Sequence, residues 1–365
     1  MLNKDKILFI TLDFPPQGGG QGIYIENIAQ ELTKKNYDVT VLTTKFSRGK
    51  NYKFPLKEIS YQGQNPIIFI FLAYLYYFFK LKKENYSIIH GNSINHLLFL
   101  LFKNKKINYL TTVHNTYLQR LEAKDRLLYK IIYPIFIKIE KIVLDKSDKI
   151  IAVSRNTRNY LDKLTKNKNV FVVENGVNTD KYKPIEKDID YFRFLYVGRI
   201  EKRKRVLETV KIFKEFLENY KGNKKIEFII AGDGPEYKKV SEYVRENNLE
   251  KIKLVGFSDN VRQYYNKARC LLLLSRGEGL PLVLLESISC GLSAIVTKDA
   301  SGLSSIVQEG VNGYIVEDEL NREEIINKMI IITNKHKIFS EKSELMAKNY
   351  DWSIIINKYL KIYNI

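Results

Sequence analysis

The sequence predicts an α/β protein with two domains, each built on a parallel sheet with helices on its faces. At 365 residues the chain is longer than most single hydrophobic cores. Short continuous apolar runs, such as Leu271 to Leu274, are typical of strands that are buried on both faces of a parallel sheet. These runs are followed by glycine-containing or polar turns and then by helix-like segments. This alternation favours βα units over separate blocks of strands and helices.

The segment Cys270 to Gly291 has this pattern most clearly. An apolar strand leads into the turn Ser275-Arg276-Gly277-Glu278-Gly279, and a helix follows. Pro281 suits the first helical position, and Gly291 suits a left-handed C-cap. In open α/β sheets ligands bind at the carboxyl ends of strands, and the start of a helix favours an anion. The segment therefore predicts a binding site for an anionic ligand.

Two carboxylates accompany this turn, and the residues alone allow two interpretations. Glu278 and Glu286 are eight positions apart. In the first interpretation both are ordinary helix-start acids, because acidic residues are common near helix starts. A carboxylate also accepts two hydrogen bonds from neighbouring hydroxyls, as on a sugar or a ribose.

The sequence around the two carboxylates resembles a known family motif. S-R-x-E-G-L-P-L-V-L-L-E, from Ser275 to Glu286, resembles the E-x7-E signature of retaining glycosyltransferases of family 4, which have the GT-B fold. The resemblance implies two Rossmann-like domains facing across a cleft. It also implies a C-terminal helix, beginning near Tyr350-Asp351-Trp352, that crosses back to the first domain. We expect an N-terminal domain at 1–183, a C-terminal domain at 184–345 and the crossing helix at 346–365, with the polar, proline-containing run KYKPIEKDID as the linker.

Two features of the first half fit the same family. A strand-like run from Lys6 to Leu12 precedes a glycine-rich loop, which is either a plain flexible turn or a phosphate-binding loop. It is not a Walker A loop, because no Gly-Lys-Ser/Thr follows. Gly19, Gly20 and Gly22 resemble the family's G-G-x-G, which closes over the donor diphosphate. His114 ends a strand; a lone histidine there is often structural, but the family places a histidine in this T-x-H context beside the donor sugar.

Basic residues follow the first strand of the second half. The cations Lys202 to Arg205 precede the start of a helix, where positive charge is opposed by the helix dipole. A diphosphate bound among them would explain this placement better than a solvated basic turn would. The segment resembles the family's G-R-x-x-x-x-K, which implies that Arg199 and Lys204 hold the donor phosphates. Arg205 stands where the family usually has glycine, and Ser305 stands where it has a glutamate, so no role is carried to Ser305.

The resemblance implies transfer of a hexose or N-acetylhexosamine from a nucleoside diphosphate sugar, with UDP the expected carrier, to an acceptor hydroxyl with retention of configuration. Arg199, Lys204 and the turn at Gly279 and Leu280 would stabilise the leaving diphosphate, while Glu278 and Glu286 would accept hydroxyls of the sugar and the ribose. Glu278 and His114 would lie beside the reacting sugar. We expect no metal and no separate cofactor. Other hypotheses are a sugar-nucleotide epimerase of the same fold and a basic nucleic-acid-binding protein, although no nucleic-acid-reading motif is present.

Charge and hydropathy indicate where such an enzyme would act. The net charge is +19, and residues 1–183 hold 30 Lys and Arg against 15 Asp and Glu. This excess either attracts an anionic surface or reflects biased composition. The apolar run Ile67 to Phe79 is too short to span a bilayer, so it predicts either a buried helix or an interfacial helix beside Lys80, Lys82 and Lys83. We expect a cytoplasmic protein without a signal peptide and with reduced cysteines. It would dock on the inner face of an anionic membrane, where lipid-linked or surface-glycan acceptors lie.

Overall fold

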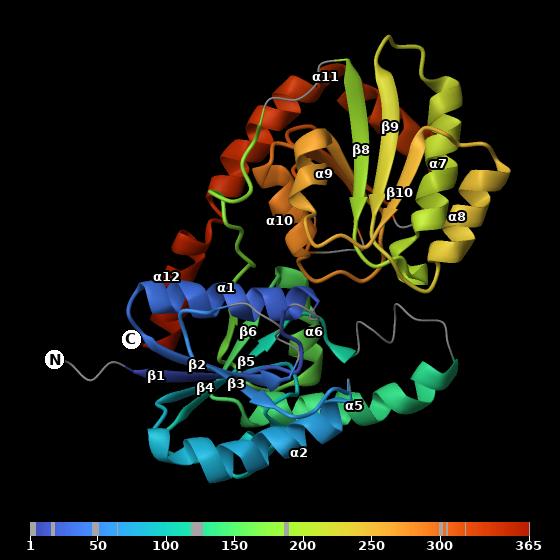
Figure 1. Cartoon of the computed structure of the whole chain (residues 1–365). Coiled ribbons are helices and arrows are strands. Elements are labelled where there is room, and N and C mark those ends of the chain that lie inside the picture. The colour runs from blue at the N-terminus through green and yellow to red at the C-terminus, as the bar shows by residue number, and fades with distance from the viewer. Residues whose placement is uncertain are drawn as a thin grey trace. The chain divides into compact units, whose positions relative to one another are not determined.

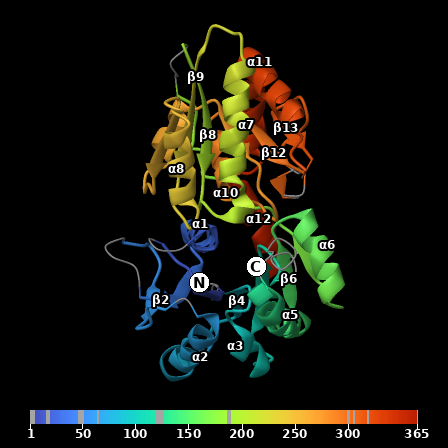
Figure 2. The ribbon, with the colours of Figure 1, turned by 90° about the vertical axis from the view of Figure 1, so that its right-hand side faces the viewer.

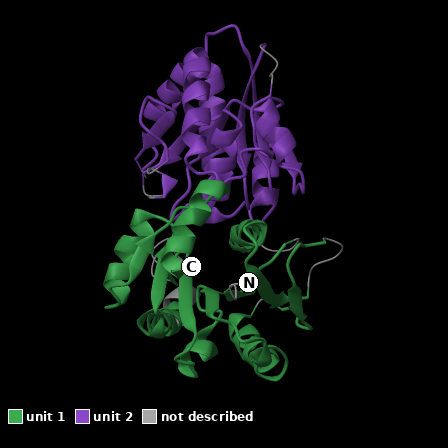
Figure 3. Ribbon diagram, turned by 90° about the vertical axis from the view of Figure 1, so that its left-hand side faces the viewer, with its two compact units in different colours: residues 1–176, 352–365 green, residues 177–351 purple. Residues whose placement is uncertain are grey.

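The computed structural model describes residues 5–15, 19–45, 51–63, 65–117, 127–185, 190–298, 302–303, 306–317 and 319–364. The chain forms two compact units (Figure 3). Unit 1 comprises residues 1–176 together with 352–365, and unit 2 comprises residues 177–351. Each unit contains its own parallel sheet, as the sequence predicts.

The sheet of unit 1 has the strand order β3-β2-β1-β4-β5-β6-β7, and its neighbouring strands pair in parallel. This Rossmann-like order reverses between β1 and β4, so the loops after these two strands lie at a topological switch point. The strands are β1 Lys6–Ile10, β2 Asp38–Thr44, β3 Leu56–Ile59, β4 Ile88–Asn92, β5 Asn108–Val113, β6 Lys149–Ala152 and β7 Val170–Val172.

The helices of unit 1 come from both ends of the chain (Figure 1). Helix α2 continues into a π-helical turn at Tyr77–Leu81 and a 3-10 turn at Lys82–Glu84. Figure 2 shows α2 and α3 side by side. The helices are α1 Gly20–Lys34, α2 Pro66–Tyr76, α3 Leu97–Leu101, α5 Leu127–Lys146, α6 Arg155–Leu164 and α12 Trp352–Tyr363.

Unit 2 repeats the same plan with the strand order β10-β9-β8-β11-β12-β13. Its order reverses between β8 and β11, which lie side by side although Leu195 and its paired residue Leu271 are 76 positions apart in the sequence. Its strands are β8 Tyr191–Val197, β9 Lys225–Ala231, β10 Ile252–Gly256, β11 Cys270–Leu273, β12 Ser293–Thr297 and β13 Gly313–Val316. Its helices are α7 Val206–Asn219, α8 Tyr237–Glu246, α9 Arg262–Lys267, α10 Leu282–Ser289 and α11 Arg322–Lys348, with a 3-10 turn at Lys202–Lys204.

The units divide at different positions from the expected 183/184 and 345/346. Val177 forms a parallel bridge with Asp351, and the Thr179 amide donates to the Asp351 carboxylate at 3.1 Å. Ser289 of α10 donates to the Tyr182 carbonyl. Residues 177–182, which include the first two residues of the polar segment that the sequence suggests as the linker, are therefore tied to unit 2. Residues 186–189 of that segment lie outside the described part of the chain.

Helix α12 joins unit 1, and Trp352 starts it. Its indole packs directly on Gly176, where a Cβ atom would lie 2.4 Å from the ring, so glycine is required at this position. Further along α12, the Tyr359 hydroxyl bonds to the Tyr24 hydroxyl of α1, which also bonds to Thr112 Oγ1 of β5 at 3.0 Å. Distant parts of the sequence thus share one buried polar cluster.

The cluster extends to His90 of β4. Its Nδ1 bonds to the Tyr363 hydroxyl and its Nε2 bonds to Thr112 Oγ1, both at 2.7 Å. Burial lowers the pKa of His90 to about 3, so its imidazole is neutral and is held at both nitrogens. The hydrogen bonds satisfy polar groups that would otherwise be costly to bury.

The apolar segment from Ile67 to Phe79 is neither fully buried nor membrane-spanning in length. Phe69, Ile70 and Ala73 pack into the core of unit 1, whereas Phe71 is 57% exposed and Phe79 is 73% exposed. The expectation of a simply buried helix is wrong for this outer face. No helix within the described ranges has the length and apolar character needed to cross a bilayer. Cys270 and Cys290 are buried and form no disulfide bond with each other.

The dependence of unit 1 on α12 is testable with neighbouring isoleucines. Ile355→Ala removes a fully buried side chain and should lower the free energy of unfolding by about 2–5 kcal/mol. Ile354→Ala, at a side chain 47% exposed, should change it by less than about 0.5 kcal/mol. Urea unfolding followed by fluorescence measures both, because Trp352 is the protein's single tryptophan and lies in unit 1. Equal effects of the two variants would contradict the packing described for α12.

Candidate functional site

The clearest polar cluster of unit 2 lies at the switch point of its sheet. Strands β8 and β11 are neighbours, with Phe194 opposite Cys270. The loop after β8 carries the basic residues from Arg199 to Arg205, and the loop after β11 carries Glu278. A backbone hydrogen bond of 2.8 Å from the Arg276 amide to the Arg203 carbonyl joins the two loops. The topology thus places the two predicted donor-binding segments together.

Glycines allow the strand ends to approach one another closely. Gly232, which follows β9, has a φ of 156°, and a Cβ atom there would lie 1.8 Å from the Gly198 carbonyl oxygen. Gly234 has a φ of 155°, and a Cβ atom there would lie 2.4 Å from the Ile200 carbonyl oxygen. Any other residue would push the loops after β8 and β9 apart.

Arg205 has a left-handed backbone, with φ 53° and ψ 36°, at the start of α7. This conformation explains why glycine is usual there in the resembling family, since side chains disfavour it. The Arg205 side chain is buried at this strained position.

Glu278 is the centre of the cluster. Its Oε1 atom accepts hydrogen bonds from Lys204 Nζ and from Arg203 Nη1, the latter at 3.1 Å. Arg203 also donates through Nε to Glu201 at 2.7 Å. Glu278 is 5% exposed and Lys204 is 9% exposed, so this is a buried ion pair with a second cation at its edge. Sequence reasoning assigned Lys204 and Glu278 to one site, and the structure brings them together.

Burial and charge act in opposite directions on these groups. Burial alone would raise the pKa of Glu278, but Lys204 and Arg203 outweigh it and hold the pKa below its usual value. Burial, with repulsion from Arg203, lowers the pKa of Lys204 in spite of the attraction of Glu278. The Glu278 carboxylate is therefore ionised at neutral pH and acts as a hydrogen-bond acceptor.

Glu286 lies in α10 and has different partners. Its Oε2 atom accepts a hydrogen bond from the Tyr265 hydroxyl at 2.8 Å, and Tyr182 also donates to this carboxylate. Burial raises the pKa of Glu286, while the two tyrosines act in the opposite direction. It is a buried acid held by neutral donors, so a simple solvated helix-start acid does not describe it.

The remaining predicted residues of unit 2 line the two loops. Arg199 is exposed, and its carbonyl accepts a hydrogen bond from the Tyr196 hydroxyl at 2.9 Å. Gly279 and Leu280 are buried in the turn before α10, and Gly302 packs against the Gly279 carbonyl. Pro281 is the N-cap and not the first helical residue, because its ψ of 132° is extended. Gly291 has the expected positive φ of 72°.

The predicted glycines of unit 1 differ in their surroundings. A Cβ atom on Gly22 would lie 2.8 Å from the Asp13 carbonyl oxygen, so glycine is needed there for α1 to pack on the loop after β1. Gly19 is the N-cap of α1 and Gly20 is its first residue. A Cβ atom added to either glycine would have no other atom of the described chain within 4 Å. Packing explains Gly22, whereas only Gly19 and Gly20 leave room for a ligand to approach.

His114 follows β5 and is buried against Tyr24. The ring centroids are 4.5 Å apart and the planes meet at 89°, an edge-to-face contact. The His114 carbonyl accepts a hydrogen bond from Thr157 of α6 at 3.3 Å. Because Tyr24 also bonds to Thr112 and Tyr359, the polar cluster that anchors α12 borders this histidine.

Sequence reasoning missed the individual contacts of Arg203 and Tyr265, and Phe257 is a further residue at these strand ends. Arg203 contacts Glu278, Tyr265 contacts Glu286, and Phe257 is 71% exposed directly after β10. An unburied phenylalanine at the carboxyl end of a buried sheet presents a flat apolar surface that suits a nucleotide base. The position after Gly256 was the available signal for Phe257; nothing in the spacing distinguished Arg203 from its basic neighbours.

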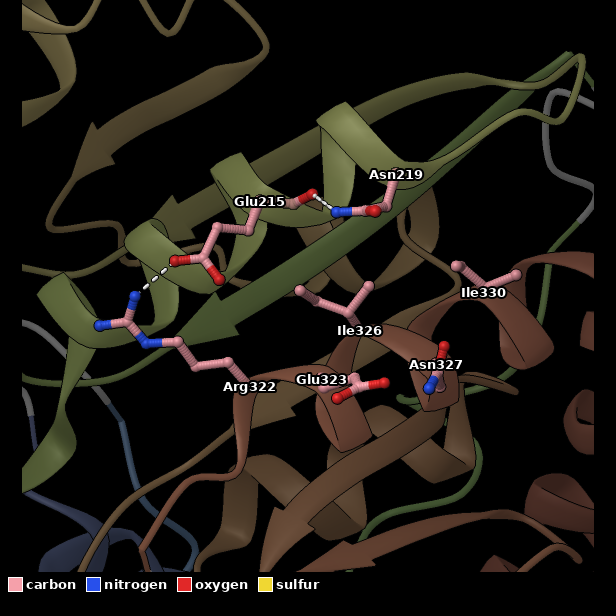
Figure 4. Close-up of a pocket in the computed structure, with 7 residues that line it drawn as sticks. All are labelled: Glu215, Asn219, Arg322, Glu323, Ile326, Asn327 and Ile330. Atoms are coloured by element: carbon pink, nitrogen blue, oxygen red, sulfur yellow. Dashed lines mark hydrogen bonds and ion pairs between the residues drawn. The ribbon is translucent and has the colours of Figure 1, made fainter.

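A pocket of about 440 Å³ lies elsewhere in unit 2 (Figure 4). Helices α7 and α11 form it, and Arg322 pairs with Glu215 across it. It contains none of the predicted site residues. Its lining consists of Glu215, Asn219, Arg322, Glu323, Ile326, Asn327 and Ile330.

Comparison with known proteins covers nearly the whole chain. Residues 177–350 match the family model described as glycosyl transferases group 1, and residues 18–181 match the model described as glycosyltransferase family 4. An uncharacterized glycosyltransferase of Methanocaldococcus jannaschii is 28% identical over 98% of this chain and 97% of its own length. The Escherichia coli UDP-Gal:alpha-D-GlcNAc-diphosphoundecaprenol alpha-1,3-galactosyltransferase is 26% identical over 74% of this chain and 70% of its own length.

Solved structures share the fold at low sequence identity. Sucrose-phosphate synthase from Thermosynechococcus elongatus has a TM-score of 0.84 at 18% identity, covering 99% of this chain and 98% of its own. Anabaena Alr3699/HepE in complex with UDP has a TM-score of 0.74 at 18% identity, covering 98% of this chain and 99% of its own. The likeness therefore extends over both units.

The two kinds of glycine in unit 1 lead to a test of packing. Gly22→Ala should destabilise the protein by about 1–3 kcal/mol, because the added methyl group meets backbone atoms. Gly20→Ala should leave stability unchanged or slightly raised, because the space is open and alanine favours helix. Thermal unfolding of the two variants measures the difference. A destabilised Gly20→Ala protein would show that this glycine, too, has a packing role.

Proposed function

Because this chain belongs to the glycosyltransferases described by the group 1 and family 4 models, we propose that it transfers a hexose or N-acetylhexosamine from a nucleoside diphosphate sugar to an acceptor hydroxyl, with retention of configuration. The GT-B fold expected from the sequence is confirmed by the likeness to solved glycosyltransferase structures. UDP is the carrier that we propose, since UDP is bound in one structural neighbour and named in the donor of one relative.

The observation that carries the proposal is the cluster of Glu278, Lys204 and Arg203 at the switch point of unit 2. A nucleotide sugar presents a diphosphate next to a ring of hydroxyl groups. The cluster offers cations next to an ionised acceptor, which is the complementary arrangement. A solvated basic turn would not be buried together with a carboxylate.

In the proposed reaction, the bond between the anomeric carbon and the terminal phosphate oxygen breaks, and negative charge builds on the leaving diphosphate. Arg199, Lys204 and the amides at the start of α10 stabilise that charge by fixed electrostatics. The anomeric carbon forms its new bond to the acceptor oxygen, and the proton of the acceptor hydroxyl passes to the departing phosphate oxygen. Glu278 accepts sugar hydroxyls and Glu286 accepts ribose hydroxyls. The proposal includes no metal ion, so EDTA should leave the rate unchanged.

A screen of donors tests this function directly. UDP-, GDP- and ADP-sugars are incubated with the protein and candidate acceptors, and release of the nucleoside diphosphate and formation of the glycoside are followed. Thermal stabilisation by donors gives a second readout, because a ligand that binds only the folded state raises the melting point. Conversion of UDP-GlcNAc to an epimer without acceptor would replace the proposal with the epimerase hypothesis.

For the acceptor, we propose a lipid-linked or surface glycan at the inner face of an anionic membrane. The outer face of α2 exposes Ile67, Ile68 and Phe71, and the π-helical turn that continues α2 exposes Phe78 and Phe79. Lys80, Lys82 and Lys83 lie in and just after this turn. Exposed aromatic side chains bordered by lysines suit the headgroup region of an acidic bilayer. One relative is named for a diphosphoundecaprenol-linked acceptor, which supports this choice.

Removing the phosphate-binding cations should slow turnover. Arg199→Ala should lose about 3 kcal/mol of transition-state stabilisation, a hundredfold or more in kcat, with folding intact because the side chain is exposed. Lys204→Ala should show a similar loss of rate. It should also lower stability by roughly 3–5 kcal/mol, because it strips a buried carboxylate of its closest cation. Near-normal rates in both folded variants would remove the phosphate assignment.

Glu286 should determine the preference for ribose. Its substitution by Gln should weaken donor binding by roughly 1.5–3 kcal/mol, the range for hydrogen bonds to charged groups. Titration calorimetry with UDP and with 2′-deoxy-UDP checks the role in the wild-type protein. If the wild type binds the two nucleotides equally well, Glu286 does not contact the 2′-hydroxyl, and its bonds to Tyr265 and Tyr182 are its whole function.

Membrane docking is tested by co-sedimentation with vesicles. The wild type should bind phosphatidylglycerol vesicles at low salt and dissociate as salt rises. The double variant Phe71→Ser/Phe79→Ser should bind much less. Leu345→Ser, at an exposed apolar side chain of α11 in unit 2, is the control and should bind as the wild type does. Equal recovery with phosphatidylcholine, or none with either lipid, would favour a soluble acceptor.

A further inference from the structure

We propose that the Glu278 carboxylate is the internal counter-ion of the diphosphate site, and that it selects a nucleoside diphosphate that still carries its sugar over the free nucleoside diphosphate. The inference rests on the proposed function and adds a means of expelling the product. Its basis is the contact between Glu278, which the proposed reaction assigns to the sugar, and Lys204, which it assigns to the diphosphate.

When no donor is bound, Glu278, which is proposed to accept the sugar hydroxyls, pairs with Lys204, which is proposed to bind the phosphates. One oxygen of Glu278 accepts from both Lys204 and Arg203. Arg203 has a second carboxylate partner, Glu201, at 2.7 Å, whereas the buried Lys204 ammonium donates its hydrogen bond to Glu278. The pKa of Glu278 is below its usual value because of these cations, so the negative charge is permanent at neutral pH.

The donor and the product differ in charge close to this carboxylate. In a nucleotide sugar each phosphate has one ester bond and shares one anhydride bond, so it carries one negative charge. After the sugar leaves, the terminal phosphate gains an ionisable oxygen whose second pKa is near about 6, so it carries an additional charge at neutral pH. That charge appears where the sugar was bonded, which is the side that Glu278 faces in the proposed complex.

The two ligands therefore interact with Glu278 in opposite ways. Sugar hydroxyls are neutral donors, and they replace the hydrogen bonds that the carboxylate gives up as Lys204 turns to the phosphates. A free terminal phosphate offers no donor and places a second anion beside a buried one. Like charges in a poorly solvated site repel strongly. The carboxylate thus favours the intact donor and weakens the hold on the product.

The test uses the whole protein with UDP, inorganic pyrophosphate and the donor identified by the screen, each titrated by calorimetry. Glu278→Gln keeps the size of the side chain and removes its charge. UDP and pyrophosphate should bind about tenfold more tightly to this variant, equivalent to about 1.4 kcal/mol, while kcat falls and inhibition by UDP becomes stronger. The gain should grow above about pH 6, where the terminal phosphate loses its second proton.

Two variants control for charge and for folding. Glu227→Gln makes the same change at another carboxylate of unit 2 that two cations hold, Arg193 and Lys253, and it should leave all three affinities unchanged. Glu278→Asp keeps the charge and should bind UDP no more tightly than the wild type. If Glu278→Gln does not fold, Glu278→Met is the second neutral variant and should show the same gain.

The outcomes separate this inference from the function on which it rests. If the wild type transfers sugar but a folded neutral variant binds UDP and pyrophosphate no better, the selection by Glu278 is overturned and the proposed function stands. If the wild type neither binds these anions nor transfers sugar from any donor, both are overturned. If Glu227→Gln binds UDP more tightly to the same extent, the gain comes from the change in net charge alone, and the inference is overturned.

Discussion

The buried pair of Glu278 and Lys204 is the interaction on which the organisation of unit 2 depends most directly. An ionised carboxylate with so little exposure is tolerated only beside a cation, and each partner comes from a different loop. The loops follow β8 and β11, which become neighbours only because the strand order reverses between them. The sheet topology therefore creates the pair, and the pair in turn fixes how the two loops meet.

Backbone geometry supports this arrangement. Gly232 and Gly234 bring the loops after β8 and β9 so close that no side chain fits between them. Next to these permissive residues, Arg205 adopts a left-handed conformation that costs energy for any residue with a Cβ atom. The chain accepts this strain where a cation is placed at the start of α7, and such local strain is common at functional sites.

The sequence was most informative where a single segment determines its own structure. The run from Cys270 to Gly291 predicted a strand, a turn and a helix, and the structure has β11, the turn and α10 in that order. The pairing of Lys204 with Glu278 was within reach because a known pattern links their loops. Arg203, Tyr265 and Tyr24 were not, because their roles come from neighbours 75, 21 and 335 residues away in sequence. The sequence also did not distinguish the buried face of α2 from its exposed face, because the residues on both faces are apolar or aromatic.

The placement of α12 has a consequence for the order in which the protein takes shape during synthesis. Unit 2 is one continuous stretch of chain, so it has all its residues before translation ends. Unit 1 begins first but lacks the partners of Tyr24, His90 and Gly176 until residues 352–363 have been made. Domains generally fold from the N-terminus as they emerge. Here the first unit to leave the ribosome is the last to be completed, and until then its polar cluster and the surface that receives Trp352 stay open to chaperones, proteases and other nascent chains.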